Sequence, residues 1–194
     1  MKKVLTLLLI GIILVGLPIY AWYYLSEGTK MRKQAMTDLE PKAEVGNFQS
    51  VTEQDSLFYS ESLKGNRWII AIIGADSLRP GHINIVKNIF KQSKEEFSVH
   101  LYSIIGLTQG ELIPEMNQKF DLPRDRNWIK TYMAEKHVYV FAADAFSIPE
   151  GHKNKNLIIF LDEFGKIRNY YNLGDAAEVK HLSRQVPVFL SLRH

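Results

Sequence analysis

The sequence contains no cysteine in its 194 residues. This absence excludes disulfide bonds, thiolate nucleophiles and cysteine-ligated zinc sites. A lipoprotein signal is excluded as well, because that signal needs a cysteine to carry the lipid. The chain also lacks a G-x-S-x-G motif, a phosphate-binding loop and a dinucleotide fingerprint. We therefore expect no enzymatic activity and no bound cofactor.

The chain also lacks a large excess of charge of one sign, since it has 24 basic and 21 acidic residues and a net charge of +3. No basic stripe interleaved with aromatic side chains occurs, so nucleic acid is not an expected partner. The hydrophobic content of 46% is that of a globular protein. The length allows one domain with a small appendage.

The appendage is an apolar run over residues 4–25, which holds no charged side chain. As a helix this run would be roughly 33 Å long, enough for a hydrocarbon core of about 30 Å. Lys2 and Lys3 precede it, and Tyr20, Trp22, Tyr23 and Tyr24 cluster at its far end, where aromatic rings favour the headgroup region. The alternative is a cleaved signal peptide, whose apolar region is typically shorter and ends at small residues. We favour an uncleaved single-pass anchor over residues 1–25, followed by a polar linker over residues 26–44.

From residue 45 onward the pattern alternates between strands and helices. We expect a hairpin at 48–51 and 57–59, strands at 67–74 and 97–105, helices at 78–92, 110–120 and 135–146, a short strand or turn at 127–132, a hairpin at 157–162 and 166–172, and a last helix capped by Asp175. The strand–helix–strand unit needs a parallel pair, and the closing hairpin adds antiparallel strands. Residues 45–194 therefore predict a thioredoxin-like α/β domain, with a central mixed sheet flanked by helices and an N-terminal hairpin extension.

Four segments carry a family resemblance. They are residues 47–55 with Leu63-Lys-Gly65, residues 68–73 with Pro80, Asn127-Trp128, and Leu161-Asp-Glu-Phe-Gly-Lys-Ile-Arg-Asn-Tyr-Tyr171. Together they resemble the Sco (SenC-type) family, membrane-anchored copper chaperones with a thioredoxin fold. The resemblance covers about residues 45–190. It implies a domain on the extracytoplasmic side of the cell (inner) membrane.

The family's copper site uses a Cys-x-x-x-Cys pair on the first loop and a distant histidine. Alignment on Pro80 puts Ala75 and Arg79 at the cysteine positions. Counting back from Asp162 puts Asn154 at the histidine position, with His152 two residues away. Soft Cu(I) needs thiolate or thioether ligands, so no copper is expected at this site.

The loop at 75–82 has two further interpretations. Asp76 or Ser77 is a natural helix cap, and His82 is expected to be an exposed residue of the first turn. Arg79 at a helix amino end would suit an acidic partner segment, or it would pair with Asp76 or stay solvated. We thus treat Asp76, Ser77, Arg79 and His82 as a candidate partner-contact loop.

Three functional hypotheses follow. The first is a redox-inactive, membrane-tethered binding module that assists the assembly of a respiratory oxidase or another copper protein, with a component of a respiratory complex as partner. The second is a thiol-independent metal carrier or enzyme that uses His82, His100, His152 and Asp76. The third is a general interaction protein of the cell envelope.

Overall fold

The computed structural model describes the backbone of residues 2–192 and the side chains of residues 14–30 and 33–192. The chain divides into an N-terminal unit that ends at Asp38 and a compact unit that begins at Leu39. The N-terminal unit is one helix, α1 (Lys2–Asp38), which continues through much of the segment expected to be a linker. All described side chains of α1 from Leu14 to Leu25 are exposed, and most are apolar or aromatic.

In the part of the chain whose residues are described, no helix is both long enough and apolar enough to cross a membrane. Residues 4–13 of the expected span lie outside the residues whose side chains are described. The anchor at 1–25 therefore stays a prediction.

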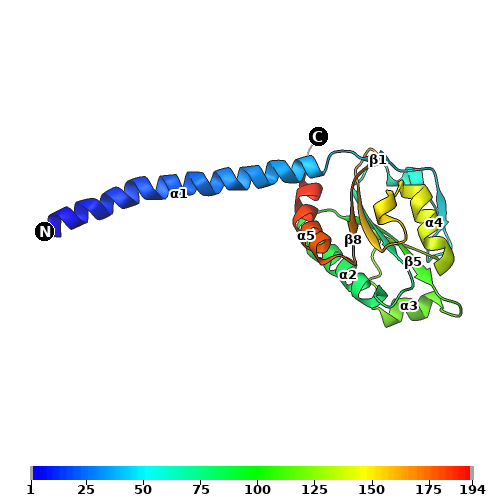
Figure 1. Cartoon of the computed structure of the whole chain (residues 1–194). Helices are drawn as coiled ribbons and strands as arrows, with labels where there is room; N and C mark the ends of the chain where they lie inside the picture. Colours follow the sequence, from blue (N-terminus) through cyan, green and yellow to red (C-terminus); the bar gives the residue numbers. More distant parts are fainter. Residues whose placement is uncertain (1, 193–194) are drawn as a thin grey trace. The chain divides into compact units, whose positions relative to one another are not determined.

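The compact unit is built on a six-stranded mixed sheet with the order β1-β8-β7-β4-β5-β6 (Figure 1). Its strands are β1 (Ala43–Glu44), β4 (Trp68–Ile73), β5 (His100–Leu107), β6 (Trp128–Ala134), β7 (Leu157–Leu161) and β8 (Lys166–Asn172). β4, β5 and β6 are parallel, whereas β7, β8 and β1 pair in antiparallel fashion. A separate hairpin of β2 (Gln49–Val51) and β3 (Leu57–Tyr59) lies between β1 and β4 in the chain.

Helices cover both faces of the sheet. They are α2 (Arg79–Glu96), α3 (Ile113–Lys119), α4 (Glu135–Phe146) and α5 (Ala176–Ser191), with short 3-10 turns at Ser60–Leu63 and Glu150–His152. In Figure 1, α2 and α5 lie on one side of the sheet and α4 lies on the other. The fold is therefore a thioredoxin-like α/β sandwich, as the sequence predicts.

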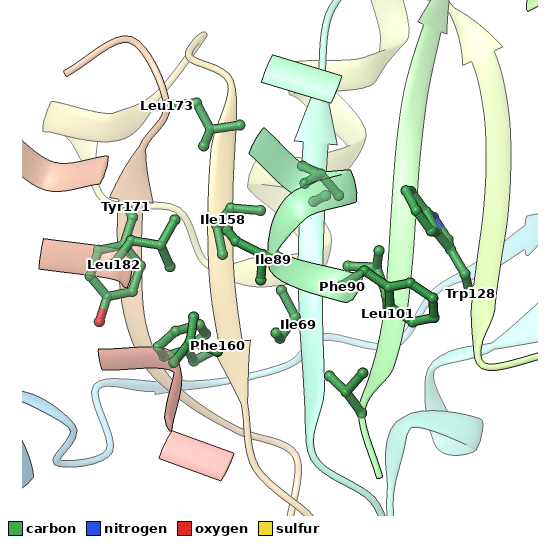
Figure 2. Close-up of a cluster of buried hydrophobic side chains, with 14 of the residues drawn as sticks. Ile69, Ile89, Phe90, Leu101, Trp128, Ile158, Phe160, Tyr171, Leu173 and Leu182 are labelled. Atoms are coloured by element: carbon green, nitrogen blue, oxygen red, sulfur yellow. The ribbon is translucent and has the colours of Figure 1, made fainter. Parts of the chain in front are cut away.

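The core has two halves because side chains alternate between the faces of a strand. Along β4, Ile69 and Ile73 pack under α2 and α5, while Ile70 and Ile72 pack under α4. Figure 2 shows the first half, where Phe160 of β7 lies near Leu182 of α5. Burial of each such side chain contributes about 1.5–3 kcal/mol. These contacts hold the strand ends in the positions from which the candidate site is built.

Most expected elements are confirmed. Both hairpins are present, α2 buries the expected stripe, and the Asp175 side chain caps α5 by accepting hydrogen bonds from the backbone nitrogens of Ala177 and Glu178. The segment at 127–132 is a full strand, paired from Trp128 to Ala134 with β5. A charged residue, Lys130, occupies a buried position in this strand. The sequence therefore does not alternate cleanly between apolar and polar residues, and its pattern did not distinguish a strand from a turn.

The compact unit begins earlier than residue 45. Leu39 is 1% exposed, and its carbonyl accepts a hydrogen bond from Arg168. Residues 43–44 form β1 and pair with Ile167 and Lys166. A two-residue strand leaves no periodic signal in a sequence, which is why the polar segment around it predicts only a linker.

Candidate functional site

Four strand ends meet at one edge of the sheet. β4 runs parallel to β5 and antiparallel to β7, so the carboxyl end of β4 lies beside the amino end of β7. Ile72 pairs with Leu157, and Leu157 pairs in turn with Asn172 at the carboxyl end of β8. The loop after a central parallel strand is where open α/β sheets commonly bind ligands. Residues 74–78 form that loop here.

Asn156, the residue just before β7, connects this loop to its surroundings. Its Oδ1 atom accepts hydrogen bonds from the Gly74 backbone nitrogen at 2.6 Å and from the Tyr139 hydroxyl at 2.9 Å. Its Nδ2 atom lies 2.7 Å from both Asp76 Oδ2 and His82 Nδ1. An amide side chain has two N–H donors and one oxygen with two lone pairs. Every donor and acceptor of the Asn156 amide therefore has a partner, and the residue is only 4% exposed.

The close packing of this network depends on Gly74. A Cβ atom at that position would lie 2.1 Å from the Tyr139 hydroxyl oxygen. The absence of a side chain thus lets α4 approach the end of β4 and bring Tyr139 to Asn156.

His82 is buried in the first turn of α2, so the expectation of an exposed histidine is wrong. Its ring contacts Asn156 and also hydrogen-bonds to the backbone of Leu173. Burial lowers the pKa of His82, and the nearby Asp76 carboxylate opposes this shift. Burial and the carboxylates of Asp76 and Glu135 raise the pKa of the Tyr139 hydroxyl. His82 and Tyr139 are consequently both neutral at pH 7.

The expected helix cap is also wrong. α2 begins at Arg79, and its N-cap residue is Leu78, which makes no side-chain cap hydrogen bond. Asp76 instead accepts a hydrogen bond from the Leu78 backbone nitrogen at 2.9 Å, within the loop. Ser77 is exposed. The carboxylate of Asp76 is directed to the loop and to Asn156, and Pro80 favours a helix start at this point because its fixed φ suits the first turn.

Arg79 is 7% exposed and is neither solvated nor paired with Asp76. Its guanidinium makes a bidentate pair with Glu111 and donates to the Gly106 carbonyl at 3.0 Å. The Arg79 guanidinium lowers the pKa of Glu111 to about 2. Whether the loop contacts a partner stays a prediction, but an acidic segment could reach this guanidinium only by displacing Glu111.

The structure separates the three positions matched to the family's copper site. Ala75 is half-buried on the loop after β4, and Arg79 lies in the ion pair. Asn154 is an exposed turn residue with a left-handed backbone, φ 56°. The residue that hydrogen-bonds to the loop after β4 is Asn156. Asn156 lies two residues after Asn154, and the only signal for it in the sequence is a polar side chain directly before an apolar strand.

The histidines do not converge on a metal site. Among the described residues, no group of three or more His, Asp or Glu side chains could hold a metal ion. His100 packs against Trp68, with ring centroids 5.0 Å apart, and His152 lies 3.4 Å from Glu178. Asp76 and His82 share Asn156 as a hydrogen-bonding partner. The Asp76 carboxylate and the His82 imidazole are thus engaged in hydrogen bonds with a neutral amide.

Two surface hollows lie away from this loop. One, of about 670 Å³, is lined by α2 and the segment before β6, including Lys87, Lys91 and Lys94. The other, of about 800 Å³, is lined by α3 and the turn of the β2–β3 hairpin, including Glu53 and Asn117. Neither hollow contains a residue singled out from the sequence as a candidate site.

The mixed sheet, the βαβ unit and the closing hairpin define a thioredoxin-like protein. No protein-family model matches the chain, and no curated protein matches it. Solved structures do match. BsSco, a member of the Sco family of cytochrome c oxidase assembly proteins, has a TM-score of 0.59 and 21% identity over 79% of this chain and 98% of that one.

Two further structures are similar. A SCO1/SenC family lipoprotein from Bacillus anthracis has a TM-score of 0.56 and 20% identity over 76% of this chain and 96% of that one. The thioredoxin domain of a thiol-disulfide oxidoreductase from Bacteroides vulgatus has a TM-score of 0.54 and 11% identity over 76% and 97%. At these identities the likeness establishes the fold. The Sco resemblance seen in the sequence is confirmed at that level.

Proposed function

We propose that the chain is a membrane-anchored, redox-inactive relative of the Sco proteins that acts as a binding module. In this role it assists the assembly of a respiratory oxidase or another copper protein on the extracytoplasmic side. The observation that carries the proposal is the loop after β4. It presents a methyl group at Ala75 and an internally paired guanidinium at Arg79, where the resemblance implies thiols. A thioredoxin-like fold with such a loop can still bind a partner, but the loop has no thiol to exchange and no sulfur to offer to Cu(I).

The anchor is supported by α1. Its described side chains from Leu14 to Leu25 are exposed apolar and aromatic groups, and a large exposed apolar surface indicates contact with a membrane or a partner. The exposed fraction of Trp22 is 75%, the highest among the large hydrophobic residues described as exposed. An aromatic cluster at the end of an apolar run suits the membrane interface. These features favour a retained anchor over a cleaved signal peptide.

The first experiment tests the absence of copper and thiol chemistry. The full chain, extracted in detergent, is titrated with Cu(I) against a competing chelator, with a cysteine-bearing Sco protein as positive control. We expect no copper to remain on this chain and no reduction of a disulfide substrate. Stoichiometric copper held against the chelator would contradict the proposal and favour a thiol-independent carrier.

The second experiment tests the assembly role in the organism that encodes the chain. Deletion of the gene is expected to lower the activity of copper-containing oxidases, and the full chain should restore it. A matched variant that lacks residues 1–25 but carries a cleaved export signal should restore it less well, because the domain is no longer held at the membrane. Unchanged oxidase activity after deletion would instead favour a general envelope interaction protein.

A further inference from the structure

The orientation of the Asn156 amide is determined by one neighbour that can only donate. The backbone nitrogen of Gly74 carries a hydrogen and lies 2.6 Å from Asn156 Oδ1. A side-chain amide turned by 180° would place its own N–H groups against this N–H. Of the two orientations, only the one with Oδ1 toward Gly74 makes a hydrogen bond with the Gly74 backbone nitrogen.

The protonation state of His82 follows from this orientation. With Oδ1 toward Gly74, the Nδ2 group faces His82 Nδ1 at 2.7 Å. An amide nitrogen donates, so Nδ1 must accept and cannot carry a hydrogen. The single proton of the neutral ring is then on Nε2.

We propose that His82 is a proton-sensitive latch that holds the loop at residues 74–78 closed only while its ring is neutral. A second proton would sit on Nδ1 and point at the N–H group of Asn156. Asn156 cannot turn to offer its oxygen, because the Gly74 N–H would then lose its acceptor. Protonation therefore breaks the contact between His82 and Asn156.

The charged surroundings indicate where the loop goes when the latch opens. His82 is faced by Asp76 from the β4–α2 loop, by Asn156 from the segment before β7, and by the backbone of Leu173 after β8. Tyr139 of α4 reaches it only through Asn156. Among the described residues, Asp76 is the one charged group that acts on the ring. An imidazolium is attracted to that carboxylate, so the open state pairs His82 with Asp76 and draws Asp76 away from Asn156.

The latch lies at the edge of the sheet that contains the loop after β4. The resemblance implies that the Sco family carries its copper-binding cysteines on this loop. Gly74, Asp76 and Tyr139 are all held by Asn156. Loss of the network frees the loop and the adjoining end of α4, while the β4–β5 and β4–β7 ladders remain. Acidification would thus expose this edge without unfolding the sheet. The inference is independent of the assembly role proposed above.

Hydrogen exchange of the full chain provides the test. The Gly74 amide is a direct reporter, because its hydrogen bond goes to Asn156 Oδ1. After correction for the intrinsic exchange rate, its protection factor should fall by up to about tenfold for each pH unit below about 6.5, where a solvated histidine gains its proton. The amide of Ala71, in the middle of β4, should keep its protection over the same range. A Gly74 protection factor that does not change between pH 7.5 and 5 would overturn the proposal.

Two further measurements keep the test decisive. His82→Gln retains an acceptor for the Asn156 amide but cannot gain a proton, so its Gly74 protection should be independent of pH. The same fall in His82→Gln as in the wild type would refute the latch. Nitrogen chemical shifts of the wild-type His82 ring need no variant. They should show the proton on Nε2 at pH 7.5, and a proton on Nδ1 would contradict the inference.

Discussion

The guanidinium of Arg79 and the carboxylate of Glu111 are joined by two hydrogen bonds, of 2.9 Å and 2.6 Å, between the start of α2 and the loop after β5. Glu111 also accepts from the backbone nitrogen of Thr108 at 2.9 Å. The pair therefore joins the start of α2 to the loop after β5 at the same edge of the sheet. A residue expected to face a partner is instead part of the structure that holds this edge together.

Glu111→Gln should destabilise the domain by about 2 kcal/mol, because the change removes a charge-assisted pair from a largely buried arginine. Urea denaturation of the domain measures the loss. Glu115→Gln is the matched control, since Glu115 is an exposed residue of the neighbouring helix α3. Equal stabilities of the two variants would show that the Arg79–Glu111 pair contributes nothing.

Acid stability should depend on the same carboxylate. Its pKa is about 2 in the folded state, below the value of about 4.3 expected for an unfolded chain. The unfolded state therefore binds the proton first, so the stabilisation is present above about pH 4.3 and is lost as the pH falls toward 2. Glu111→Gln should flatten this part of the stability–pH curve. A curve parallel to that of the wild type would contradict the assignment.

The sequence predicted those elements whose patterns are local. The apolar run of β4, the stripe of α2 and the turn between β7 and β8 each carry their signal within a few residues, and the structure contains all three. Burial of charged groups was not foreseen. Arg79 and His82 look exposed in sequence because their partners, Glu111 and Asn156, are distant in the chain.

The sequence singles out the loop after β4, but it does not single out Asn156, the residue that hydrogen-bonds to Gly74 and Asp76 of that loop. The loop after β4 does lie at the edge that the fold predicts, next to the start of β7. Asn154, the position reached by counting back along the hairpin, is an exposed turn residue with a left-handed backbone. A hydrogen-bond network centred on an amide side chain has no characteristic spacing in the sequence. The role of Asn156 could therefore be recognised only from the structure.

Gly74→Ala should destabilise the domain by about 1–3 kcal/mol, the usual cost of forcing extra atoms into a packed interior. The added methyl group would overlap the Tyr139 hydroxyl, 2.1 Å away. In the double variant Gly74→Ala, Tyr139→Ala the loss should be smaller than the sum of the two single losses, because the overlap is removed. Thermal unfolding of the four proteins gives the coupling. Additive losses would mean that Gly74 is not needed for the approach of α4.

The last prediction concerns Lys130, which is buried on β6. Its side chain is 1% exposed, and its Nζ atom lies 2.9 Å from Glu53 Oε1 and donates to the Pro123 carbonyl at 2.8 Å. Glu53 belongs to the turn of the β2–β3 hairpin, and its backbone nitrogen donates to the Lys130 carbonyl. The pair therefore joins the hairpin to the edge strand of the sheet.

Glu53→Gln should destabilise the domain by about 3 kcal/mol, because it leaves the Lys130 charge buried without its counter-ion. The double variant Glu53→Gln, Lys130→Met should regain most of this loss, since it removes the buried charge that Glu53→Gln leaves without a counter-ion. Chemical denaturation of the wild type, both single variants and the double variant measures the coupling. If the double variant is no more stable than Glu53→Gln alone, the cost comes from lost packing of the hairpin and the uncompensated charge of Lys130 is not its cause.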